Sequence, residues 1–187
     1  MNDKPLYDAH YTTTAKALHW LMALLLIGLL AMGFIMTEMP LSPQKLRVVS
    51  WHKWAGVTVF VLLLVRVSWR STRRPPPLPW QMRKLQQMGA HLGHLALYGL
   101  MIALPISGWL MSSAKGVQTV WFGVVPIPDL LAKDKALGDL LDQVHESLSW
   151  VLVVHVVAAL KHHYVDKDDI LTRMLPNRQR APEPTEQ

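Results

Sequence analysis

The chain has 187 residues, which suits a single domain, and 51% of them are hydrophobic, with ten methionines and eight tryptophans. It contains no cysteine, which excludes disulfide bonds, cysteine-ligated iron–sulfur clusters and covalently attached c-type haem. The formal net charge is +6, but the basic residues flank long apolar runs, a pattern that indicates membrane orientation rather than a nucleic-acid-binding surface.

Four apolar runs approach the ~20 residues that are needed to cross a bilayer. In chain order they lie at about 17–37, 52–70, 92–112 and 143–163. The first run is too long for the core of a cleaved signal peptide, and no small-residue cleavage site follows it, so we expect a retained span. The sequence therefore predicts an all-α integral membrane four-helix bundle over residues 1–176, with a polar cytoplasmic tail over 177–187.

The connections between the runs carry residues that end helices. Residues 38–50 include Pro43, and residues 70–90 include four prolines between positions 75 and 79, which cannot continue a helix. The longest connection spans 112–142, and we expect a short amphipathic piece within it at about 130–141.

The distribution of lysine and arginine predicts the orientation. If the N-terminus lies inside, thirteen of these basic residues fall on the inner side and six on the outer side. Because cytoplasmic segments carry an excess of lysine and arginine, we expect both termini in the cytoplasm and a multi-pass protein of the bacterial inner membrane.

Four of the nine histidines lie within or at the mouth of the apolar runs: His19, His52, His145 and His155. An ionisable side chain at membrane depth is costly unless it is paired, faces a cavity or binds something. Neutral imidazole is also a common axial ligand of haem iron, and helix bundles often hold such cofactors in their cores.

The spacing of the histidines predicts two sites. His145 and His155 are ten residues apart, which on a helix is about 15 Å along the axis and about 80° around it, so they cannot hold one iron together. His19 lies at the inner end of its run and matches His155 in depth, while His52 and His145 both begin their runs on the outer side. We therefore expect two metal-binding pairs, His19 with His155 and His52 with His145, stacked across the membrane.

Other interpretations of these histidines stay open. Each could form hydrogen bonds between helices, and a zinc site is a further alternative, although His145-Glu146 lacks a second histidine at zinc-ligand spacing. A zinc or proton transporter is a related hypothesis, which the small number of helices disfavours.

Three more residues are weaker candidates. His94 and Arg66 lie where they could contact haem propionates, and His162, seven residues beyond His155, could contact a quinone headgroup or relay a proton to it. The alternative for each is a polar residue that solvates the end of a helix, or an arginine that reaches the interface.

Short motifs near the span ends are similar to those of the bacterial cytochrome b561 family. They are Leu18–Trp20, Trp51–Lys53, Ala90–His94, Ala103–Gly108, His145-Glu146, Lys161–Tyr164, Lys167-Asp168 and Arg173-Met174. Together they cover nearly the whole chain, from about residue 14 to 176.

The resemblance implies a four-helix protein of the inner membrane with two b haems, whose axial ligands would be the same four histidines. It also implies electron exchange between a periplasmic donor, superoxide in some members, and membrane ubiquinone. The alternative is a haem-bearing membrane anchor or electron-transfer subunit for a separate dehydrogenase or other redox partner. The resemblance leaves open whether the chain is itself a superoxide:ubiquinone oxidoreductase, and it gives no nucleic-acid partner.

Overall fold

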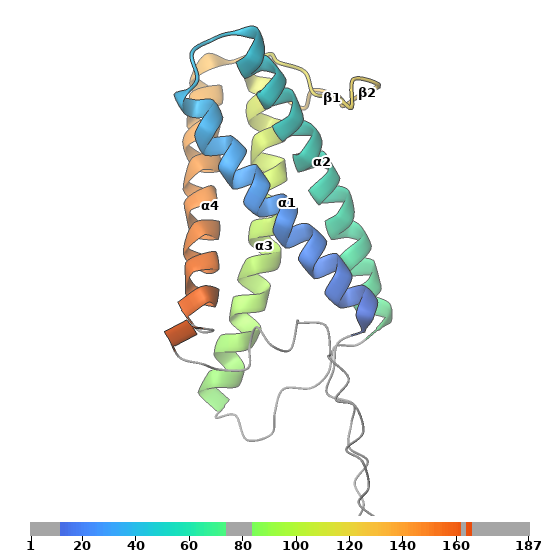
Figure 1. Ribbon diagram of the computed structural model, residues 1–187. Coiled ribbons are helices and arrows are strands. Elements are labelled where there is room, and N and C mark those ends of the chain that lie inside the picture. Colours follow the sequence, from blue (N-terminus) through green and yellow to red (C-terminus); the bar gives the residue numbers. More distant parts are fainter. Residues whose placement is uncertain (1–11, 74–83, 162–163, 166–187) are drawn as a thin grey trace, which may run out of the picture.

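The structure is a computed structural model that describes residues 12–73, 84–161 and 164–165; the side chains of residues 84–87, 89–91 and 94 lie outside the description. The described residues form four long helices and one short hairpin (Figure 1). The elements in chain order are α1 (Thr13–Glu38), α2 (Pro43–Thr72), α3 (Lys84–Ala114), β1 (Val120–Trp121), β2 (Val125–Pro126) and α4 (Lys135–Lys161). The predicted all-α four-helix architecture is confirmed.

All four helices begin earlier than the apolar runs do, and side-chain caps are visible at the starts of α2 and α4. The Ser42 hydroxyl accepts a hydrogen bond from the Lys45 amide at 3.2 Å, and Pro43 occupies the first turn of α2. Proline suits this position because the first amides of a helix have no partner within the helix. At the start of α4, the Asp134 carboxylate accepts a hydrogen bond from the Leu137 amide at 3.0 Å.

The prediction of a separate amphipathic piece at 130–141 is wrong, because the residues from Lys135 onward form the first turns of α4. The prediction took the approach to the last apolar run as an independent element. An Asp134 cap instead lets one continuous helix start in polar sequence and run into the apolar segment.

Helices α1 and α2 pack around a first buried cluster. Met22 and Leu29 of α1 are seven residues apart and so lie on one face, and they meet Val59 and Leu63 of α2. Half-buried Tyr98 and Met101 pack against this cluster from α3. These contacts join the first helix pair to the second.

Helices α3 and α4 pack around a second buried cluster. Leu100 and Leu104 of α3 are one turn apart and contact Leu152 of α4. Leu26 and Leu30 of α1 pack against the same cluster, so α1 contributes to both clusters.

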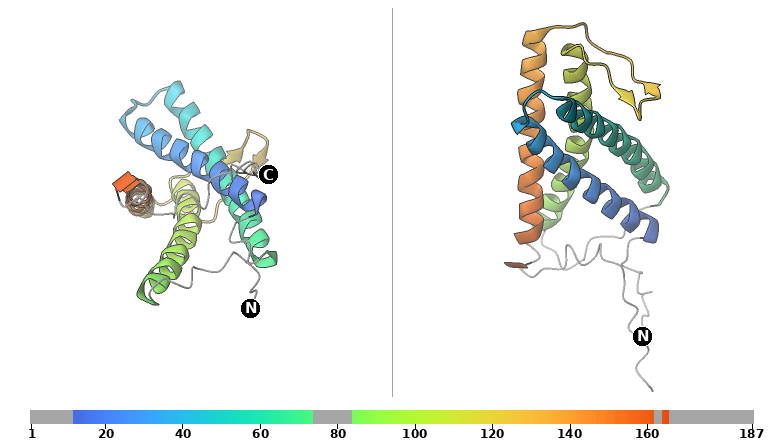
Figure 2. Two further views of the ribbon diagram at one scale, coloured as in Figure 1. Left: turned by 60° about the horizontal axis from the view of Figure 1, so that its bottom comes forward. Right: turned by 45° about the horizontal axis from the view of Figure 1, so that its top comes forward.

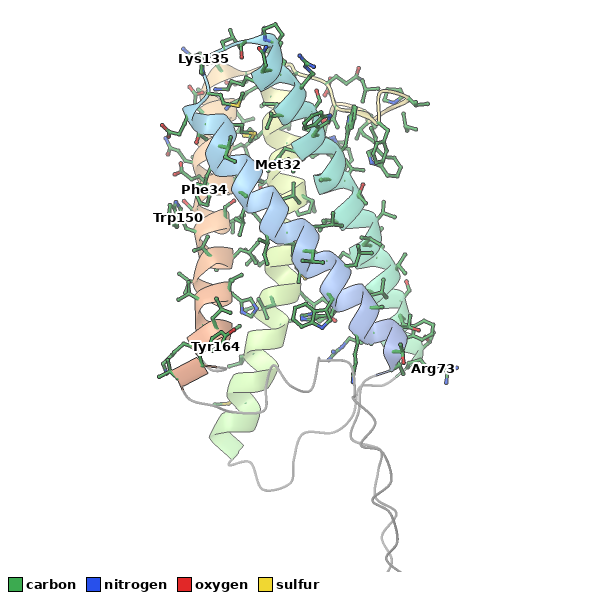
Figure 3. All side chains as sticks on the ribbon, viewed as in Figure 1. Met32, Phe34, Arg73, Lys135, Trp150 and Tyr164 are labelled. Atoms are coloured by element: carbon green, nitrogen blue, oxygen red, sulfur yellow. The ribbon has the colours of Figure 1, made fainter. Side chains whose placement is uncertain are left out.

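The first helix crosses the bundle obliquely, from beside α4 to beside the far end of α2 (Figures 1 and 2). Two contacts fix its ends. Near its C-terminus, the Phe34 ring lies 5.1 Å from the Trp150 ring of α4 (Figure 3), and at its start the Trp69 indole of α2 donates to the Thr12 hydroxyl at 3.2 Å.

All four helices are long and apolar enough to cross a membrane. Large apolar side chains also cover their outward faces; for example, Leu24, Leu95 and Val154 are between 67% and 70% exposed. Such a surface is unfavourable in water and favourable in lipid. We call the end that holds residues 39–42 and 115–134 the outer end, and the opposite end the inner end.

Candidate haem-binding site

Two of the four intramembrane histidines, His52 and His145, lie on the side of their helices that also supplies buried residues. His52 precedes Val59 by seven residues, and His145 precedes Leu152 by the same number. Seven residues are close to two full turns, so these histidines point in the same direction as the buried side chains. Their helices therefore direct them toward the interior of the bundle.

The structure brings the outer pair together. The rings of His52 on α2 and His145 on α4 face each other across the bundle, with ring centres 6.3 Å apart and ring planes at 77°. A metal ion bound at about 2 Å by one nitrogen of each ring, on opposite sides, would place the ring centres roughly 6 Å apart. The separation of this pair therefore suits two imidazoles that would hold one metal atom between them.

His52 has a buried nitrogen that is available for such a bond. Its Nδ1 atom is shielded from solvent and has no hydrogen-bond partner. Buried polar atoms without a partner are rare and costly, and they are a reason to look for a ligand. The orphaned nitrogen and the ring separation both fit a haem iron.

The hydrogen bonds of Ser107 on α3 favour one tautomer of His145. The Ser107 hydroxyl donates its only hydrogen to the Leu104 carbonyl at 2.9 Å, because a carbonyl can only accept. The same oxygen lies 2.9 Å from Nδ1 of His145, so it can accept a hydrogen from that nitrogen while its own hydrogen bonds to Leu104. In this tautomer Nδ1 of His145 carries the proton, and Nε2 keeps the lone pair that a metal requires.

Two glycines leave room for these rings. A Cβ atom added at Gly108 of α3 would lie 3.2 Å from Cε1 of His145, and one added at Gly33 of α1 would lie 3.7 Å from Cε1 of His52. Gly56 and Gly99 have nothing within 4 Å of such an atom. The outer rings are thus bordered by backbone, which allows a flat group to come close.

At the inner end, His19 of α1 interacts electrostatically with His155 of α4 and with Arg66 of α2. The His19 ring also meets Trp20 edge-on at 5.6 Å between ring centres. His19 and Arg66 are half-buried, and His155 is exposed. The inner residues therefore lie in one neighbourhood, formed by three helices.

Two of the predicted contact residues cannot be placed. The side chain of His94 and the whole of His162 lie outside the described residues. The Arg70 guanidinium lies 5.5 Å from the centre of the Tyr98 ring, a cation–π contact between α2 and α3.

Among the described residues, no three or more histidine, aspartate or glutamate side chains meet in a group that could hold a metal ion. The rings of His52 and His145 face each other, and His19 interacts electrostatically with His155. Sequence reasoning identified these four residues but gave no role to Ser107. The only signal was its place in the Ala103–Gly108 motif, since a lone serine in an apolar helix usually bonds to its own backbone.

A four-helix membrane bundle with inward-facing histidines at two depths is typical of membrane cytochromes that hold b haem between their helices. A family model described as prokaryotic cytochrome b561 matches residues 10–177, and the chain belongs to this family.

Three relatives show the same similarity. The chain is 38% identical to cytochrome b561 homolog 2 of Escherichia coli K12 over 171 residues, which covers 88% of this chain and 90% of that protein. It is 31% identical to the probable superoxide oxidase CybB of Yersinia pestis over 172 residues, or 90% and 97% of the two chains. It is 31% identical to cytochrome b561 homolog 1 of E. coli K12 over 136 residues, which covers 68% of this chain and 74% of that protein.

Family membership and the four apolar helices establish the general character of the protein. It is a multi-pass protein of the bacterial inner membrane, it binds b-type haem, and it takes part in electron transport.

Proposed function

We propose that the chain carries electrons across the inner membrane through two b haems, from a periplasmic donor to ubiquinone. The outer haem would be held between His52 and His145, and the inner haem between His19 and His155. The proposal rests chiefly on the ring-centre distance of 6.3 Å between His52 and His145, which suits one iron atom between two imidazoles. The electrostatic contact of His19 with His155 supports the second site.

A b haem supplies one-electron oxidation and reduction when it is bound. The protein residues hold and orient this chemistry. Ser107 bonds to Nδ1 of His145 and orients its ring, and Gly33 and Gly108 keep side chains away from the outer rings. Buried apolar residues between the two depths, such as Met22 and Val59, exclude water from the interior.

Superoxide is the donor that the relatives favour, because the Yersinia pestis protein is named a probable superoxide oxidase. In such a reaction, two superoxide ions lose one electron each and become two dioxygen molecules. One ubiquinone molecule takes up these two electrons with two protons and becomes ubiquinol. The excess of basic residues at the inner end supports our assignment of the donor side to the outer end.

The inner end would then serve the quinone. Arg66, close to His19, is suited to pair with a haem propionate, and His94 is a second candidate for that contact. His162 is our candidate for quinone contact, from its position in the sequence seven residues after His155. Replacing His162 with alanine should slow ubiquinone reduction by the pre-reduced protein while the haem spectra stay unchanged. Wild-type kinetics would remove His162 from the site.

The function is tested with purified protein in liposomes that contain ubiquinone. Enzymatically generated superoxide should reduce ubiquinone in the presence of the wild-type protein and of Gln143→Ala, an exposed α4 residue close to His145. It should not do so with His145→Ala. If the wild-type haems are reduced but no ubiquinol forms, the chain is better explained as a haem-bearing subunit for a separate dehydrogenase.

A further inference from the structure

The connection between α3 and α4 contains a segment with no charged residue. Residues 117–128 have the sequence VQTVWFGVVPIP and form the β1–β2 hairpin, while Lys115 and Asp129 flank them. A connection on the aqueous side of a membrane usually carries charge. Here the charges stand at the two ends of the hairpin and are absent from its tip.

The hairpin is bound to the side of α2 rather than lying over the centre of the bundle (Figures 1 and 2). Lys53 donates to the Val117 carbonyl at 2.8 Å, and the Trp54 indole donates to the Val120 carbonyl at 2.6 Å. The Trp121 indole of β1 in turn donates to the Thr58 hydroxyl at 3.3 Å.

The depth of Trp54 and Thr58 in a membrane follows from counting along α2. Arg70 is in the last turn of α2, and counting about 20 residues outward from it places the outer boundary of the hydrocarbon near Trp51. Trp54 is then about one turn inside this boundary, and Thr58 about two turns inside it. By this count, a hairpin that bonds to both residues lies at the depth of the outer interface of the membrane rather than wholly in the water above it.

The tip of the hairpin exposes apolar side chains. Val124 is 78% exposed, Phe122 is 58% exposed and Val125 is 46% exposed. Phe122 has a φ of 49°, and the following Gly123 has a φ of 72°, so the turn adopts left-handed backbone that is rare for a bulky residue. The turn thus exposes two valines and part of Phe122, whose ring also packs against the rings of Trp54 and Trp121, each with ring centres 5.4 Å apart.

The backbone of the hairpin is largely satisfied within the protein. The Gly123 amide donates to the Val120 carbonyl at 3.1 Å, the Val124 amide to the Trp121 carbonyl at 3.0 Å and the Ile127 amide to the Thr119 carbonyl at 2.8 Å. Lipid offers no replacement for missing hydrogen bonds, so an element that enters it must meet this condition. Tryptophan at its rim is also characteristic of the membrane interface.

We propose that the tip of the β1–β2 hairpin, Phe122, Val124 and Val125, inserts into the interface of the outer leaflet and anchors this connection in lipid. We assign lipid as the occupant because α2 is long and apolar enough to cross a membrane, and the hairpin bonds to Trp54 and Thr58 of this helix, on the inner side of the boundary counted from Arg70. Since Lys53 and Trp54 directly follow His52, the anchored hairpin also steadies the turn of α2 that carries this histidine. The inference does not depend on how many haems are bound.

The natural absence of cysteine allows a direct test. Val124→Cys and Ala132→Cys, an exposed residue of the same connection, are each labelled with an environment-sensitive fluorophore and placed in phosphatidylcholine nanodiscs. With the haem spectrum as a check of folding, the label at 124 should emit at shorter wavelength. Lipids brominated near the headgroup should quench it at least twofold more than the label at 132.

Water-like emission at 124 with no quenching by brominated lipid would overturn the proposal. Short-wavelength emission without bromine quenching would also overturn it, because the tip would then be covered by protein, such as a second copy of the chain. If labelling at 124 disturbs the haem spectrum, Val125→Cys provides the same test from β2, with the same two outcomes.

Discussion

Replacing Ser107 with alanine removes the hydroxyl that forms a hydrogen bond with Nδ1 of His145. The bond is 2.9 Å long and the serine is only 6% exposed, so water cannot easily take its place. A buried donor that loses its acceptor costs about 1–3 kcal/mol. Losing the outer partner of a metal-bound histidine typically lowers metal affinity by roughly 10–100-fold, a similar amount of free energy.

The haem at the outer site should report this loss in two ways. Its affinity should fall by about tenfold or more. Its midpoint potential should rise, because an imidazole that donates a hydrogen bond is more basic and favours the oxidised iron. If the hydrogen bond stabilises the oxidised haem by about 1 kcal/mol more than the reduced haem, losing it raises the midpoint potential by about 40 mV. This follows because a tenfold change in a one-electron equilibrium corresponds to 59 mV.

Spectroscopic redox titration of the purified protein measures both quantities. Ser113→Ala is the matched control, because Ser113 is also a buried serine of α3 but bonds to Trp109 and Leu130 instead of a histidine. Unchanged affinity and potential of the outer haem in Ser107→Ala would refute the reasoning. So would an equal shift in the Ser113→Ala protein.

Two further predictions concern the outer site and the topology. Gly108→Ala should displace the His145 ring, since the new Cβ would lie 3.2 Å from it, at a cost of about 1–3 kcal/mol and with partial loss of the outer haem. Gly99→Ala is the control, because nothing lies within 4 Å of its new Cβ, and it should keep full haem content. Equal haem content in the two variants would contradict this prediction. A reporter fused after Gln187 should be active in the cytoplasm, and one inserted near Lys133 should be active in the periplasm. An exported C-terminus would reverse the assignment of the inner and outer sites.

The fold was largely predictable because lipid imposes simple conditions on the sequence. A span needs about 20 apolar residues, and the four runs meet this length. The ends of the helices were less predictable, since they depend on local caps. Pro43 reads as a helix breaker in sequence, yet at the first turn of α2, after the Ser42 cap, it is compatible with the helix.

The histidines could be selected from the sequence because polar groups at membrane depth are expensive and therefore few. The matching depth of His52 and His145 in their predicted spans was enough to predict that they form a pair, and the structure brings these rings together. Ser107 could not be found in this way, because its role depends on the angle at which α3 faces α4. The β1–β2 hairpin was also missed, since its strands are two residues each and its hydrogen bonds to α2 link residues more than sixty positions apart.

The most direct test of the two-site account is the haem content and spectrum of four purified variants, in each of which one of His19, His52, His145 and His155 is replaced by alanine. The wild-type protein should bind two haems per chain. His52→Ala and His145→Ala should each lose the same spectral component, and His19→Ala and His155→Ala should each lose the other. If His145→Ala and His155→Ala remove the same component, the two histidines of α4 serve one site and the account is wrong.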